Sequence, residues 1–191
     1  HTRLVSVNYW HRYGSRDVKL WLRLFDDAGH ELASWEKLLP DGSVGFTIDS
    51  QEVRARHNTG PFVGQLFIHA VNVAGHDVVK YALDTYGDEV GALSCTHDAN
   101  AWPSDLYAGL PAPAEGERVT LWIQNSHPTK IPADSIGLNR MGSQEVGWLK
   151  KEVPPFGSFA LDVSTLLPEL VWPDQIEIRA GKHMVRPRYE V

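Results

Sequence analysis

Apolar and polar residues alternate with a period of two along most of this chain, which is the pattern of β-strands that have one face on a core. Residues 18–25 show the alternation most clearly. One face of this stretch carries Val18, Leu20, Leu22 and Leu24, and the other carries Lys19, Trp21, Arg23 and Phe25. Turn signals rich in Gly, Pro and Asp separate the alternating stretches. The pattern predicts an all-β chain built from short strands.

The predicted strands fall into two similar series. In the first half they cover residues 4–10, 18–25, 31–38, 44–49, 65–73 and 78–83. In the second half they cover residues 119–124, 136–141, 146–153, 159–162 and 175–180. Short helical pieces are expected in two places, near residues 50–57 and 164–168. The first of these has a Ser or Asp N-cap at its front and a Gly at its end.

One stretch occurs twice, and the rest of the chain is organised around it. Residues 35–49 and 148–162 each begin at a Trp, cross a Pro and a Gly-Ser pair, and continue through alternating apolar residues to an Asp. The order of the surrounding strands is kept between the two halves. About six short strands per half, separated by frequent turns, are typical of a sandwich. The sequence therefore predicts tandem duplicated immunoglobulin-like β-sandwich units, either as two small sandwiches or as one fused sandwich.

The duplication divides the chain into three parts. Residues 1–87 are expected to form the first β-sandwich repeat, and residues 118–191 the second. Residues 88–117 are rich in Pro and Gly and alternate little, so they are expected to form a long ordered connecting loop. Connections of this length inside a compact domain are uncommon and often carry function.

The strand predicted at 65–73 is apolar on both faces from residue 66 onward, whereas a strand between core and water alternates. Its second face, which carries Phe67, should therefore be shielded. The expected cover is the long connection, through Leu93, Trp102, Leu106 and Tyr107, and the alternatives are the second repeat or a partner subunit. In the second half the same face carries Gln175, Glu177 and Arg179, which water can solvate.

Composition and charge exclude some functions. The 191 residues are 42% hydrophobic, enough for a core without disulfides, and the single cysteine excludes an internal disulfide. A net charge of −6 argues against a nucleic-acid partner, which normally meets a basic footprint. No apolar run is long enough to span a bilayer, so no membrane partner is expected. Phosphate loops, nucleophile elbows and Cys or His pairs with zinc spacing are missing from the sequence, so no cofactor or metal is expected.

The densest polar stretch is residues 95–107, which combine a thiol, an imidazole, carboxylates, an amide and aromatic rings. Such a set suits a polar ligand, with an aromatic ring as a stacking surface and the polar groups as hydrogen-bond partners. The candidate ligand-binding residues are His69, which is expected beneath this stretch, with His97, Asp98, Asn100, Trp102, Asp105 and Tyr107. The alternative is a long ordered loop whose Asp, Asn and Ser side chains satisfy its own backbone. A catalytic Cys95–His97 pair is disfavoured, because a thiolate needs a positive setting that the sequence does not show.

His1 raises a second chemical possibility. An amino-terminal His chelates copper through its α-amine and Nδ1, with a second His completing the site. In that one residue and in fold class the chain resembles lytic polysaccharide monooxygenases, which implies copper chemistry, but no matching motif surrounds its other histidines. A start at His1 rather than Met also predicts that a signal peptide, a tag or a preceding domain has been removed.

The function favoured by these observations is a non-catalytic β-sandwich module, part of a longer protein, that binds a small polar ligand, a glycan or a protein partner. The alternative is an enzyme, with a site in residues 95–107 or as a copper-dependent oxidase that uses His1.

Overall fold

The computed structural model describes residues 1–191 except 77, 90–92, 99–105, 181–182, 184–187 and 191. The described residues form antiparallel sheets with only short helical segments, which confirms the all-β class. None of the described helices is long and apolar enough to cross a membrane. The chain divides into two compact units: unit 1 is His1–Leu24, Glu31–Phe62 and Leu66–Ala101, and unit 2 is Phe25–His30, Val63–Gln65 and Trp102–Val191. Each unit is described by itself below.

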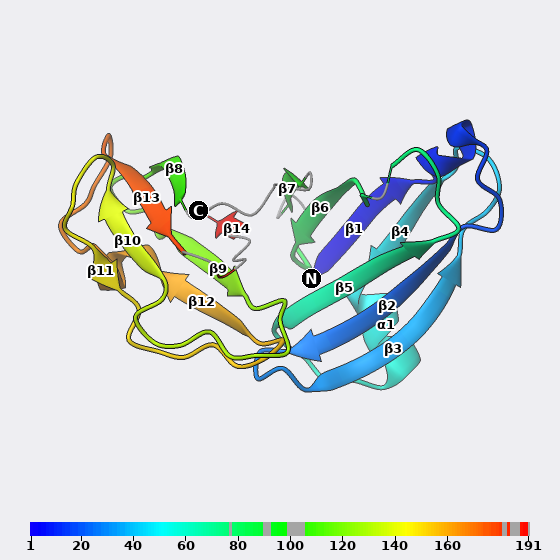
Figure 1. The fold of residues 1–191 in the computed structure, drawn as a ribbon, viewed down its shortest axis with the longest axis horizontal. Helices are drawn as coiled ribbons and strands as arrows, with labels where there is room; N and C mark the ends of the chain where they lie inside the picture. Colours follow the sequence, from blue (N-terminus) through cyan, green and yellow to red (C-terminus); the bar gives the residue numbers. More distant parts are fainter. Residues whose placement is uncertain (77, 90–92, 99–105, 181–182, 184–187, 191) are drawn as a thin grey trace. The chain divides into compact units, whose positions relative to one another are not determined.

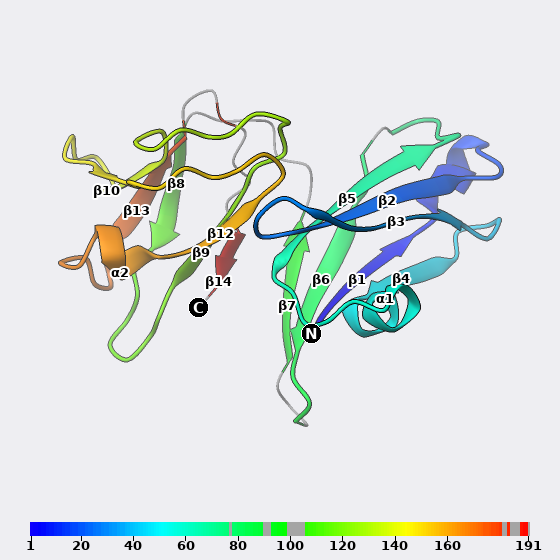
Figure 2. The ribbon, with the colours of Figure 1, turned by 90° about the horizontal axis from the view of Figure 1, so that it is seen from below.

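The strands of unit 1 form two sheets that lie as two layers (Figures 1 and 2). One sheet has the order β4-β1-β6-β7 and the other the order β3-β2-β5. These strands are β1 (Thr2–Val7), β2 (Lys19–Asp26), β3 (Glu31–Leu38), β4 (Gly45–Asp49), β5 (Gly64–Val71), β6 (Tyr81–Tyr86) and β7 (Leu93–Asp98). Inward-facing apolar side chains fill the space between the layers, among them the fully buried Trp10, Leu20 and Leu22.

Helix α1 (Ser50–His57) begins and ends at the predicted residues. Asp49 caps its amino terminus by accepting a hydrogen bond from the backbone N–H of Gln51, at 2.8 Å. Asn58 ends it in a left-handed conformation. A second helical segment, η1 (Tyr9–Tyr13), was not predicted, because the strand pattern runs into its first two residues, up to Trp10. It turns the Trp10 indole into the core, where its N–H donates to the carbonyl of His76 at 2.7 Å.

Unit 2 also contains two sheets, with the orders β12-β9-β14 and β11-β10-β13-β8. Its strands are β8 (Leu106–Pro111), β9 (Thr120–Gln124), β10 (Gly137–Arg140), β11 (Gly147–Trp148), β12 (Ser158–Asp162), β13 (Gln175–Arg179) and β14 (Arg188–Glu190). Leu121, Leu138 and Ile176 lie at the centre of a core that leaves no room for a water molecule between them. Helix α2 (Val163–Leu166) follows β12 and is capped by Asp162, so it begins close to the predicted position.

The segment 88–117, expected as a connecting loop, contributes two strands instead. β7 pairs with β6 along its whole length, with Tyr81 opposite Asp98. β8 pairs with β13 through an irregularity at which Gly109 adopts φ +84°. A glycine tolerates this backbone conformation, so the extra residue of a bulge fits there. Both strands escaped prediction because backbone hydrogen bonds to a sheet edge require no alternation of apolar side chains.

Two short segments from the first half belong to unit 2. Phe25 was expected on the outward face of its strand beside Lys19, but it is buried at 3% exposure and stacks on Phe156, with ring centroids 5.0 Å apart. Gln65 is also buried, and its Nε2 donates to the carbonyls of Asn125 at 2.9 Å and Gly157 at 3.1 Å. A period-two pattern cannot foresee this change, because it reports which face a side chain takes and not what covers that face.

Candidate functional site

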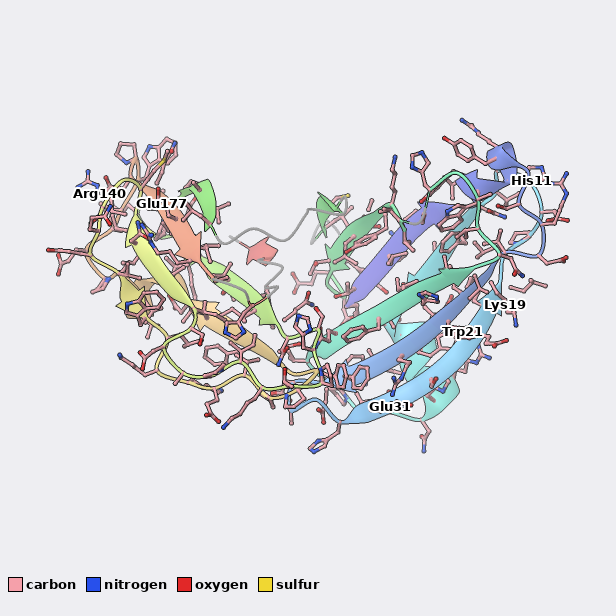
Figure 3. The ribbon with its side chains drawn as sticks, in the orientation of Figure 1. His11, Lys19, Trp21, Glu31, Arg140 and Glu177 are labelled. Atoms are coloured by element: carbon pink, nitrogen blue, oxygen red, sulfur yellow. The ribbon has the colours of Figure 1, made fainter. Side chains whose placement is uncertain are left out.

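The outward face of the β3-β2-β5 sheet in unit 1 presents an exposed tryptophan. Alternation along β2 sends Leu20 and Leu22 into the core, and Lys19, Trp21 and Arg23 to the opposite side. Lys19, Trp21 and Glu31 project from the β2–β3 pair in Figure 3. Half of the Trp21 side chain is open to solvent (50%), whereas Trp10 in the core of the same unit is fully buried. A large aromatic ring left half exposed on a regular sheet is available for contact with a ligand.

Two neighbours on the adjoining strands orient the Trp21 ring. His69 on β5 lies against it, with ring centroids 6.0 Å apart and planes inclined by 39°. The other neighbour is Glu36 on β3, whose carboxylate pKa is lowered in part by the Trp21 side chain. Lys19 donates to the same carboxylate, with Nζ 2.9 Å from Oε2. The Lys19 hydrogen bond is the main cause that lowers the pKa of Glu36, and Trp21 acts in the same direction.

A second ion pair lies farther along the same strands. The Arg23 Nε donates to Oε2 of Glu31 at 3.0 Å. The two ion pairs give this side of the sheet two positive and two negative groups. The formal charge of these four groups is therefore zero. We call this surface the Trp21 face and define it by Lys19, Trp21, Arg23, Glu31, Glu36 and His69.

The predicted ligand-binding residues are not brought together by the described part of the structure. His69 is exposed beside Trp21 on β5, not buried beneath residues 95–107 as expected. The backbones of His97 and Asp98 lie in β7, which belongs to the other sheet of unit 1, and that of Tyr107 lies in β8 of unit 2. The side chains of these three residues lie outside the description, as do Asn100, Trp102 and Asp105 entirely. A shared site for this set stays a prediction.

The structure describes only part of the cover expected over Phe67. Phe67 and Val71 are half-buried. Leu93 and Leu106, two of the residues expected to shield them, are themselves exposed, at 63% and 41%. Both stand on strands held by backbone pairing, so their side chains are not needed to fix the segment. Trp102 and the Tyr107 side chain, the other two, lie outside the described residues.

Cys95 is in a setting that keeps its thiol protonated. Its side chain hydrogen-bonds to the Asp84 carboxylate, and this contact is the main cause that raises the thiol pKa. Asp84 in turn accepts a hydrogen bond from the Arg3 Nη2 at 2.8 Å, so the charge of Arg3 is paired with this carboxylate. An activated thiolate needs a positive group beside the sulfur instead of a carboxylate. The geometry therefore agrees with the sequence in disfavouring Cys95 as a nucleophile.

The His1 ring lies beside a carboxylate. Its Nε2 is 3.1 Å from Oδ1 of Asp88. Among the residues that the structure describes, no group of three or more His, Cys, Asp or Glu side chains is placed to hold a metal ion. The copper site would need only one histidine in addition to His1, which is fewer than such a group, so the copper hypothesis stays a prediction.

In unit 2, the outward side of β10 and β13 is closed by the unit's own residues. Gly137 lies so close to Val146 and Trp148 that a Cβ there would come 2.7 Å from the indole. Glu177, which is labelled in Figure 3, was expected in water, but it is buried, with 8% exposure. The amide of Asn139 donates to it at 2.6 Å, and the N–H of Gly142 at 3.2 Å. These hydrogen bonds replace the lost water, and they lower the pKa of Glu177.

The sequence pattern placed Trp21 on the polar face of its strand but gave no sign of its role. The only signal was an aromatic residue between Lys19 and Arg23 at outward positions. The partners Glu36 and His69 come from other strands, and their approach to Trp21 depends on strand pairing that alternation does not specify.

Comparison with protein-family models, curated proteins and solved structures finds no significant match to this chain.

Proposed function

We propose that this chain is a non-catalytic β-sandwich module that binds a glycan on the Trp21 face. The observation that carries the proposal is the half-exposed Trp21 indole, which lies against the His69 ring and beside Glu36 on a paired sheet. Binding surfaces work best when the stacking group is fixed before the ligand arrives, because less conformational entropy is lost.

The chemistry of a sugar matches this surface. One face of a pyranose ring carries C–H groups, which pack on the flat apolar surface of an indole. The hydroxyl groups at its edge both donate and accept hydrogen bonds. Beside Trp21, Lys19 offers donors and Glu36 offers acceptors at neighbouring positions. A few polar groups around an apolar surface are the usual composition of a ligand site.

We also propose that the two units descend from one duplicated immunoglobulin-like β unit. The order β4-β1-β6 in unit 1 corresponds to β12-β9-β14 in unit 2, and β3-β2-β5 corresponds to β11-β10-β13. In both units the strand after the repeated turn ends at an Asp that caps a short helix, Asp49 before α1 and Asp162 before α2.

This correspondence supports a single site. The side of unit 2 that matches the Trp21 face is closed over Gly137 by Val146 and Trp148, and Asn139 is fully buried there. Trp21 is 50% exposed between charged side chains, whereas Trp148 on the matched face of unit 2 is 37% exposed and packs over Gly137. We therefore expect one glycan-binding site per chain.

The test is binding of the wild-type chain to a panel of soluble polysaccharides, by affinity electrophoresis and isothermal titration calorimetry. Trp21→Ala should weaken binding at least about tenfold, because the stacking surface is lost. The matched control is Trp172→Ala, which removes another exposed tryptophan (62%) in unit 2 and should leave binding unchanged. Equal losses in both variants, or a glycan bound no less well by Trp21→Ala, would contradict the proposed site. Binding of a protein instead of any glycan would favour the module's alternative partner class.

A further inference from the structure

The geometry points to an uncharged glycan as the ligand of the Trp21 face, an inference that rests on the proposed function. The charges of the face are already paired. Lys19 Nζ lies 2.9 Å from Glu36, and Arg23 Nε lies 3.0 Å from Glu31. Each cation on the face thus has a carboxylate of its own chain beside it.

This pairing decides which sugars fit. Recognition of a uronate or a sulfate ester normally uses a cation whose hydrogen bonds are directed at the incoming anion, best as a two-pronged arginine contact. On this face Arg23 directs both Nε and Nη2 to Glu31. An anionic group approaching Lys19 would also approach Glu36, which repels it, and the attraction and repulsion largely cancel.

A neutral sugar meets no such conflict. Its hydroxyl groups accept from the remaining N–H donors of Lys19 and donate to the remaining lone pairs of Glu36, without breaking the ion pair. The low pKa of Glu36, caused first by Lys19 and then by Trp21, keeps this carboxylate in its accepting form. The same three residues thereby supply the stacking surface, the donors and the acceptors.

The experiment compares matched neutral and anionic polymers, hydroxyethylcellulose against carboxymethylcellulose, then neutral glucans, mannans, xylans and galactans against polygalacturonate, alginate and chondroitin sulfate. We expect the wild-type chain to bind at least one neutral polymer, with at least tenfold weaker binding to every anionic one. Glu36→Gln leaves Lys19 without its carboxylate partner. This variant should therefore gain salt-sensitive binding to anionic polymers and lose part of its neutral binding.

The outcomes separate the two proposals. Tighter binding of anionic polymers by the wild type, abolished by Trp21→Ala, would overturn the neutral-ligand inference and leave the glycan site standing. No binding to either set by a chain that circular dichroism shows to be folded would overturn the proposed function itself. Unchanged selectivity in Glu36→Gln would show that the Lys19–Glu36 pair does not set the ligand class.

Discussion

At the level of single residues, Gly64 occupies a position that admits no side chain. A Cβ added there would meet the carbonyl of Phe25, whose carbon lies 2.9 Å away, and the Cα of Asp26 at 3.0 Å. These are backbone atoms of a paired strand, so they cannot move aside cheaply. We predict that Gly64→Ala lowers the free energy of unfolding by about 1–3 kcal/mol, measured by urea denaturation. Gly60→Ala is the control, because nothing lies within 4 Å of that position, and a comparable loss there would refute the steric explanation.

Glu177 makes the stability of unit 2 depend on pH. Hydrogen bonds from Asn139 and the Gly142 N–H lower its pKa in the folded state. The carboxylate therefore contributes stability that is fully present above the ordinary glutamate pKa and is lost as the pH falls through the lowered value. We predict that Glu177→Gln flattens the acid side of the stability profile and destabilises the chain at pH 7. The check is urea unfolding between pH 7 and pH 3, and an unchanged acid slope would exclude this role.

At the level of elements, Asp49 connects β4 to α1. Its carboxylate accepts from the Gln51 N–H, the capping bond, and from the Tyr86 hydroxyl at 2.8 Å. Loss of an N-cap costs about 0.5–2 kcal/mol, so we predict a loss of that size for Asp49→Ala in thermal unfolding. Asp49→Asn keeps an oxygen that can cap the helix and should lose less. If the two variants were equally destabilised, the capping bond would not be the main contribution of Asp49.

The elements also show how far the sequence leads. Alternation located β2, and cap residues located α1, because burial and capping each impose a residue type at a fixed spacing. β7 and β8 were missed because edge strands are held by backbone hydrogen bonds that any residue can make. Because this pairing was not predicted, the segment was expected to be a loop, and its polar residues 95–107 were expected to bind the ligand. Trp21 becomes a candidate only when Glu36 and His69 are seen on the neighbouring strands.

At the level of the whole molecule, unit 2 is not a continuous stretch of sequence. It includes Phe25–His30 and Val63–Gln65 in addition to the second half of the chain. The Ser158 N–H donates to the carbonyl of Asp27 at 3.0 Å, and Phe156 is covered by Phe25. A fragment that begins at Trp102 therefore lacks two segments of unit 2.

The last prediction follows from this composition. A fragment of residues 102–191 lacks the ring that stacks on Phe156 and the Gln65 amide that satisfies the carbonyls of Asn125 and Gly157. We predict that this fragment has no cooperative thermal transition by circular dichroism, whereas the full chain has one. In the full chain, Gln65→Leu should cost about 1–3 kcal/mol, because buried carbonyls lose their donor, and Gln51→Ala on the exposed side of α1 should be neutral. A fragment that unfolds cooperatively at the temperature of the full chain would show that unit 2 does not depend on the two segments from the first half.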